Sequence, residues 1–127
     1  MAHDVKKSVW DAVEACRAIS EFTAGLTLEA HRSDLRNRLA IERAFEILGE
    51  ALKRVRDADP SFCERFPEMR AVIGMRDRIA HGYDVVDDNI VLRAASQDLP
   101  PLMTTLKAWL EKNDPPSKEP EMNTEPC

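Results

Sequence analysis

The sequence feature that most constrains the fold is a long stretch in which apolar residues recur at helical spacing. Between Asp34 and Arg56, apolar side chains fall on a repeating set of positions: Leu35, Leu39, Phe45, Leu48, Ala51, Leu52 and Val55. Such spacing places them on one face of an α-helix and leaves the charged residues outside that face. Ser33 is in position to cap the helix, and Pro60 follows its end. The pattern predicts one long amphipathic helix from Asp34 to Arg56.

The rest of the chain shows the same pattern in shorter pieces. We predict further helices from Asp4 to about Glu21, from Pro67 to His81, from Asp84 or Asp87 to about Pro100, and from Leu102 to about Lys112. Gly25 lies in a predicted turn, Gly82 ends a helix, and Pro100 with Pro101 breaks another. Glycines are few and alternating β-branched runs are lacking, which disfavours strands. The predicted fold is therefore all-α, an antiparallel bundle of four to five helices.

Composition and charge divide the chain into a body and a tail. With 43% hydrophobic and 32% charged residues, the 127-residue chain suits one folded domain, which we place at 1–112. Residues 113–127 are rich in proline and acid, with almost nothing to bury, and are predicted to be a disordered tail. Four acidic residues and one lysine give this tail −3 of the net −5, which leaves −2 for the body. Partners of the body must therefore be judged from local patches.

Several classes of protein are disfavoured. No apolar run approaches the ~20 residues that a membrane span requires, and the N-terminus lacks the apolar segment of a signal peptide. The cysteines are Cys16, Cys63 and Cys127, an odd number without a CxxC pair. This pattern argues against a disulfide framework or a zinc site and fits the reducing cytoplasm. We predict no membrane partner, no metal and no cofactor.

Chemistry concentrates at one helix junction, "MRDRIAHGYDVVDD", residues 75–88. An unbroken helix would place Arg76 and Tyr83 about 20° apart on one face, but His81 about 140° from Arg76. Two routes bring Arg76 and His81 together. The helix can bend or end between them, a step that the nearby Gly82 makes inexpensive. Alternatively, a symmetric dimer can bring two copies of the junction to one site.

Arginine and histidine together can cleave RNA without a metal. A guanidinium matches phosphate oxygens and stabilises the charge that gathers on them, and an imidazole exchanges protons near neutral pH. The imidazole can take the proton from a ribose 2′-OH or protonate the departing 5′ oxygen. A structural reading stands beside this, because basic residues in a last helical turn interact favourably with free carbonyls. Asp84, Asp87 and Asp88 suggest Mg²⁺ or, more commonly, helix caps.

The junction resembles the signature of HepT-like proteins in the HEPN superfamily: Arg, four to six residues, His, any residue, then Tyr. Arg76, His81 and Tyr83 meet it. Three blocks also resemble the family in its order: "IERAFEILGEAL", "RAVIGMRDRIAHGYD" and "LPPLM". The resemblance covers about residues 3–112 and is far more specific than the motif alone.

This resemblance implies a HEPN-like all-α bundle and a homodimer with the motif helices at a shared cleft. It implies a metal-independent endoribonuclease toxin that acts on RNA, with Arg76 and His81 as catalytic residues. The usual partner is an MntA-like nucleotidyltransferase antitoxin, which in such systems transfers AMP to the motif tyrosine, here Tyr83.

Two positions depart from the common pattern. Asp77 stands where a polar residue, often Asn, follows the motif arginine, and Leu92 where many relatives carry Trp. Asp77 can orient Arg76 or His81, or it can weaken RNA binding. Two other readings therefore stay open: a non-catalytic helical partner or substrate-binding subunit of a nucleotidyltransferase, and a generic dimeric scaffold.

Other polar and aromatic residues have looser predictions. The long helix has an acidic edge that is either solvated or part of a dimer cleft: Glu42, Glu46 and Glu50. An arginine edge is a further candidate RNA contact: Arg32, Arg36 and Arg43. The remaining predictions place His3 and His31 at the surface, Trp10 and Trp109 in the core or an interface, and Cys63 in the interior.

Overall fold

The computed structural model describes residues 2–81 and 87–113, and only the backbone of residues 2–4, 63, 80 and 81. Four long helices make up most of this part of the chain: α1 (Ala2–Thr23), α3 (Leu35–Ala58), α5 (Pro67–His81) and α7 (Leu99–Asn113). Short elements join them: α2 (Leu28–Ser33), α4 (Pro60–Arg65), α6 (Asp88–Arg93) and the π-helix η1 (Ala94–Asp98). The described residues contain no strand, so the predicted all-α class is confirmed.

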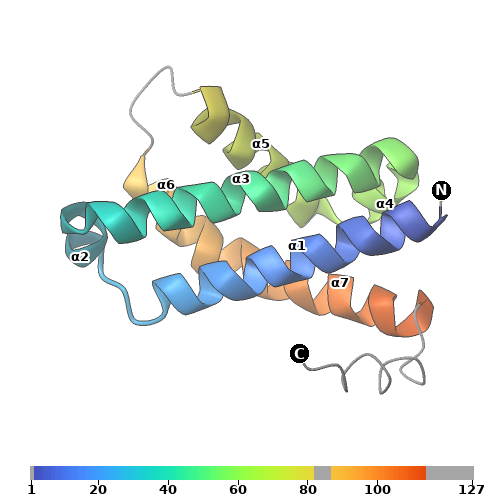
Figure 1. Cartoon of the computed structure of the whole chain (residues 1–127), viewed down its shortest axis with the longest axis horizontal. Helices are drawn as coiled ribbons and strands as arrows, with labels where there is room; N and C mark the ends of the chain where they lie inside the picture. The colour runs from blue at the N-terminus through green and yellow to red at the C-terminus, as the bar shows by residue number, and fades with distance from the viewer. Residues whose placement is uncertain (1, 82–86, 114–127) are drawn as a thin grey trace, which may run out of the picture.

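The long helices form an antiparallel bundle with α3 near its middle (Figure 1). Helix α1 runs beside α3 in the opposite direction, α5 packs against another side of α3, and α7 lies along α1. The side of the α1–α3 pair that faces the viewer in Figure 1 has no other helix over it. The predicted tail, from residue 114 onwards, and the junction residues 82–86 lie outside the described residues.

The core is built from one apolar face of each long helix. Its largest fully buried side chains are Phe45, Phe62, Ile19, Ile41, Leu48, Leu52, Met69, Leu99, Leu102 and Leu106. The predicted stripe of α3 is confirmed from Phe45 to Val55 but is wrong at its start. Leu35 and Leu39 are 56% and 53% exposed, because they lie about 120° and about 160° around the helix from Ile41.

Two predicted helix starts are also wrong. Helix α1 begins at Ala2, so Asp4 lies within it rather than capping it. The cap of α3 is Asp34, not Ser33: the Asp34 carboxylate accepts a hydrogen bond from the backbone N–H of Asn37 at 3.1 Å. The predicted turn at Gly25 is confirmed, and Gly25 has a φ of 67°, a conformation that suits glycine.

The predicted break at Pro100 and Pro101 does not occur. Helix α6, η1 and α7 follow one another without a gap, and both prolines lie in the first turn of α7. A proline is tolerated there because the N–H that it lacks would have little use. The wider π-helical turn before them is closed by the Leu99 N–H, which donates to the Ala94 carbonyl.

The interior of the bundle makes one thiol inert. Burial raises the pKa of the Cys16 thiol to about 12, so this side chain stays protonated at neutral pH. Such a thiol is neither a nucleophile nor a metal ligand. Among the described helices, none combines the length and the apolar character that crossing a membrane requires.

Candidate functional site around Arg76

Helix α5 carries Arg76, Asp77 and His81 of the predicted site. Pro67 stands at its first position, and its apolar side chains face the core: Met69, Val72, Ile73, Met75 and Ile79. Arg76 and Asp77 lie at the edge of this apolar face, beside α3. The site is therefore positioned by the packing of α5 against α3, which is the main contact that α5 makes.

Two carboxylates hold the guanidinium of Arg76. Its Nη2 lies 2.6 Å from Oε1 of Glu50 on α3, and its Nη1 lies 3.1 Å from Oδ1 of Asp77. The side chain is 23% exposed, and its Nε is buried without a hydrogen-bond partner among the described residues. Only the outer end of the fork therefore faces solvent.

Gly49 makes the close approach of Arg76 to α3 possible. A Cβ placed on Gly49 would overlap the Cβ and Cγ of Arg76, and it would lie 3.4 Å from Cδ. The aliphatic part of Arg76 thus rests directly on the backbone of α3. Because these atoms are near the main chain of α5, they cannot swing aside as the end of a flexible side chain can.

Asp77 links Arg76 to a second cation. Its Oδ1 also lies 3.6 Å from Nζ of Lys53 on α3. Burial alone would raise the pKa of the Asp77 carboxyl, but the hydrogen bond from Arg76 and the charge of Lys53 outweigh it and hold that pKa below its usual value. Asp77 is thus ionised at neutral pH, and the hydrogen bond that it accepts from Arg76 orients the guanidinium.

The other two motif residues are only partly described. Helix α5 runs from Pro67 to His81, as predicted, so it does not end between Arg76 and His81. In a continuous helix these two side chains leave the axis about 140° apart. The His81 side chain, Gly82 and Tyr83 lie outside the described residues, as does Asp84. Asp87 caps α6 and accepts from the Asn89 N–H at 2.9 Å, so the cap reading is confirmed for this acid.

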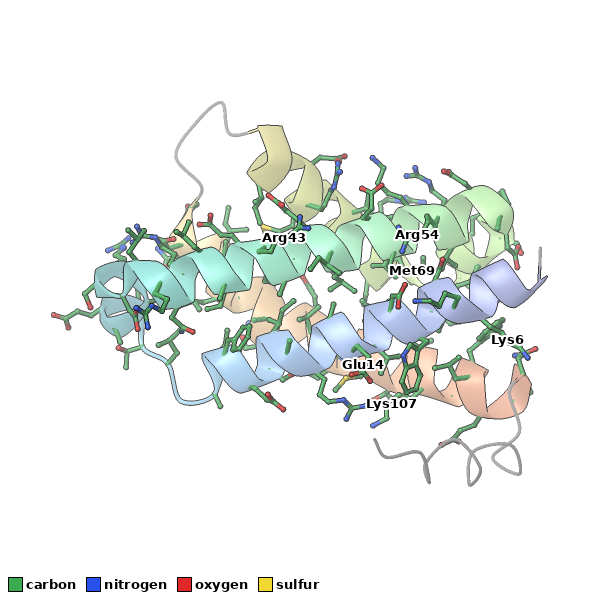
Figure 2. The ribbon with its side chains drawn as sticks, in the orientation of Figure 1. Lys6, Glu14, Arg43, Arg54, Met69 and Lys107 are labelled. Carbon is green, nitrogen blue, oxygen red and sulfur yellow. The ribbon has the colours of Figure 1, made fainter. Side chains whose placement is uncertain are left out.

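A groove of about 630 Å³ lies beside Arg76, between α1 and α3. Ile47 and three alanines give it an apolar floor: Ala15, Ala18 and Ala44. Charges of both signs line its rim, among them Glu14 from α1 and Arg43 and Arg54 from α3 (Figure 2). The two arginines are paired, Arg43 with Glu46 at 3.2 Å and Arg54 with Asp11 at 3.5 Å. The groove is therefore mixed in charge rather than uniformly basic.

A second titratable cluster lies at the junction of α2, α3 and α6. His31 was predicted at the surface but is fully buried, and its Nε2 lies 3.2 Å from Oδ1 of Asp88. Arg32 approaches the other oxygen of Asp88 at 3.7 Å. Burial raises the pKa of the neighbouring Glu42 carboxyl, and the charge of Arg38 offsets part of that rise. The cluster ties the start of α6 to α2, next to the segment that follows His81.

Comparison with known proteins assigns the chain to a family. The model of a family described as "Ribonuclease HepT-like" matches residues 12–109, most of the chain. The chain belongs to the HepT-like ribonuclease family. It is 33% identical over 114 residues to a Thermococcus cleftensis protein named "Probable ribonuclease HepT", and the alignment covers 88% of this chain and 97% of that protein. A Methanocaldococcus jannaschii protein named a "Putative RNase" is 28% identical over 99 residues, which cover 76% and 88% of the two chains. No solved structure matches the chain.

In this HepT-like chain, the contacts of three residues near Arg76 were not predicted from the sequence. Gly49 gave no signal of close packing, since a single glycine inside a helical pattern has many readings. Glu50 was grouped with Glu42 and Glu46 as one edge, although it alone reaches Arg76. Lys53 was not singled out. The "LGEAL" end of the first family block contains two of these residues, Gly49 and Glu50.

A pair of glycine substitutions tests the close contact of α3 with α5. Gly49→Ala must push Arg76 away, and we expect it to lower the free energy of unfolding by about 1–3 kcal/mol. Gly74→Ala is the matched control, because its Cβ would meet nothing within 4 Å. In a helix that change is expected to stabilise by about 0.5–1 kcal/mol. Urea titration measures both, and equal stability of the two variants would contradict the contact.

Proposed function

We propose that this HepT-like chain is a metal-independent endoribonuclease toxin that acts in the cytoplasm, with Arg76 and His81 as its catalytic residues. The observation that carries the proposal is the motif arginine itself, which the described part of α5 holds in a fixed position within a ribonuclease family member. In the reaction, the ribose 2′-oxygen attacks the adjacent phosphorus and the bond to the 5′ oxygen breaks. The products are a 2′,3′-cyclic phosphate and a free 5′-hydroxyl.

Each catalytic residue has one task in this reaction. His81 takes the proton from the 2′-OH, or gives one to the departing 5′ oxygen. Arg76 donates to the phosphate oxygens, where negative charge gathers in the transition state. A guanidinium has five N–H donors in a planar fork, and the two carboxylate contacts of Arg76 leave part of that fork available.

We further propose that the active form is a homodimer. Because α5 is unbroken between Arg76 and His81, one chain directs these side chains about 140° apart, and a second copy offers a way to complete the site. The exposed apolar side chains Leu35, Leu39 and Ile47 lie on α3, and Ile47 lines the groove beside Arg76. A groove with charges of both signs can be self-complementary in a two-fold contact.

We propose that an MntA-like nucleotidyltransferase antitoxin controls the enzyme by transferring AMP to Tyr83. The support is the family motif, in which this tyrosine stands two positions after His81. An added phosphate at that place would compete for the anion site and repel RNA. One covalent change would thus block the substrate without unfolding the chain.

The second candidate function is a non-catalytic helical partner of a nucleotidyltransferase. Its specific support is the pairing of Arg76 with Glu50 and Asp77, since a doubly paired cation attracts RNA weakly. Both functions predict association with a nucleotidyltransferase. They differ in whether the separated chain cleaves RNA.

Cleavage of RNA by the purified, unmodified protein in EDTA separates these functions. We expect fragments ending in cyclic phosphate, and none from RNA that carries 2′-deoxyribose at the cut site. His81→Ala and Arg76→Ala should each lower the rate by about 100-fold or more, whereas Arg78→Ala, an exposed arginine on the same helix, should not. An inactive wild type, or full activity of His81→Ala, would favour the non-catalytic partner.

The AMP proposal has a simple readout because Tyr83 is the only tyrosine in the chain. After incubation with ATP and the nucleotidyltransferase, we expect the intact mass to rise by one or more AMP residues and RNA cleavage to fall. Tyr83→Phe should show neither effect while still binding the transferase. A mass gain that persists in Tyr83→Phe would place the modification elsewhere and reject this acceptor.

Sedimentation velocity tests the dimer. We expect the wild type to sediment as a dimer and Ile47→Glu to shift it to monomer, because a buried charge in an apolar contact is costly. Ala108→Glu adds the same charge at an exposed position of α7 and should leave the dimer intact. A wild type that stays monomeric at high concentration would rule out a shared site.

A further inference from the structure

We propose that Glu50 is a positioning residue, which fixes the direction of the Arg76 guanidinium and at the same time weakens its attraction for RNA. The inference rests on the proposed function for the role of Arg76 but not for the contact itself. Glu50 belongs to α3 and Arg76 to α5, and their charged groups meet at 2.6 Å. A charge-assisted hydrogen bond of this length is among the stronger kinds.

The Glu50 contact differs from the contact with Asp77. Asp77 neighbours Arg76 in the chain, and its carboxylate is shared with Lys53 at 3.6 Å. It moves with α5 and reaches α3 only through the longer contact with Lys53. Glu50 approaches from α3, next to Gly49, on which the stem of Arg76 rests. The stem and the head of Arg76 are thus both held by consecutive residues of α3.

The exposure of Glu50 indicates that this ion pair orients the Arg76 guanidinium more than it stabilises the fold. Glu50 is 49% exposed, and ion pairs that are this accessible to water contribute little to folding. A fixed direction has a larger effect on a reaction, because misplacing a catalytic group by ~1 Å can lower a rate by about 100-fold. The contacts use one N–H on each terminal nitrogen of Arg76 and leave one on each for a phosphate.

The same arrangement has an electrostatic cost for binding. Arg76 and Lys53 carry two positive charges, and Glu50 and Asp77 carry two negative ones, so the four-residue network is neutral. A phosphate that approaches it meets no net positive charge. Glu50 therefore affects two separable quantities: its oxygen sets the geometry of Arg76, and its charge opposes the substrate.

Two substitutions at Glu50 separate these effects in the full-length protein. Glu50→Gln keeps an oxygen that can accept from Arg76 but removes the charge, and Glu50→Ala removes both. Glu111→Ala is the matched control, because Glu111 is exposed on α7, away from the packing of α3 against α5. All three changes raise the net charge by one.

Steady-state kinetics with RNA gives one readout. We expect KM to fall in both Glu50 variants, because a repelling charge is gone. We expect kcat to fall by about 10-fold or more in Glu50→Ala only, with most of it restored in Glu50→Gln and no loss in Glu111→Ala. Unchanged kcat in Glu50→Ala, or an equal loss in Glu111→Ala, would overturn the positioning role.

A second readout does not depend on activity. NMR of the arginine side chains reports how fast the Arg76 Nε–H exchanges with water and how freely its guanidinium turns. We expect exchange and rotation to increase in Glu50→Ala, to stay near wild type in Glu111→Ala, and to be intermediate in Glu50→Gln. If the wild type cleaves no RNA but these changes occur, the proposed function fails and the positioning stands. Identical Arg76 signals in wild type and Glu50→Ala would reject the positioning.

Discussion

The contact of α3 with α5 at Gly49 is the constraint on which the candidate site depends. Only a residue without a Cβ lets the stem of Arg76 lie on the backbone of α3, and this closeness brings the guanidinium within reach of Glu50. A larger residue at Gly49 would separate the helices and leave Arg76 to sample many rotamers. The position of the cation is therefore set by helix packing first and by ion pairing second.

The helical fold and the candidate site residues of α5 could be predicted from the sequence because both depend on short-range patterns. Apolar periodicity located the four long helices, and the motif singled out Arg76. Contacts between helices leave no such short-range pattern in the sequence. Glu50 resembles Glu42 and Glu46 in sequence, and only the packing of α5 against α3 distinguishes it. His31 seemed a surface residue because its partner, Asp88, belongs to a distant helix.

The errors at the helix ends have local causes. Pro100 and Pro101 were read as a break, but a proline disrupts a helix only where its N–H is needed, and a π-turn before α7 removes that need. Leu35 and Leu39 were added to the core because leucine is apolar, although their phase differs from that of Phe45 and Leu48. Together with Ile47, which lines the groove between α1 and α3, they leave apolar side chains of α3 available for a partner.

The two acidic residues beside Arg76, which we propose to contact phosphate, have opposite effects on its orientation and on its attraction for RNA. Asp77 and Glu50 lower the attraction of the site for polyanions, and they also reduce the number of directions that Arg76 can adopt. A ribonuclease that relied on electrostatic attraction alone would bind the phosphate backbone of any RNA equally well, in any position. With a neutral network, the phosphate has to meet the guanidinium of Arg76 in the right orientation before the contact contributes to binding. Such a phosphate contact carries little information about the base sequence. The balance of charge around Arg76 thus favours correct geometry of the bound substrate over tight binding.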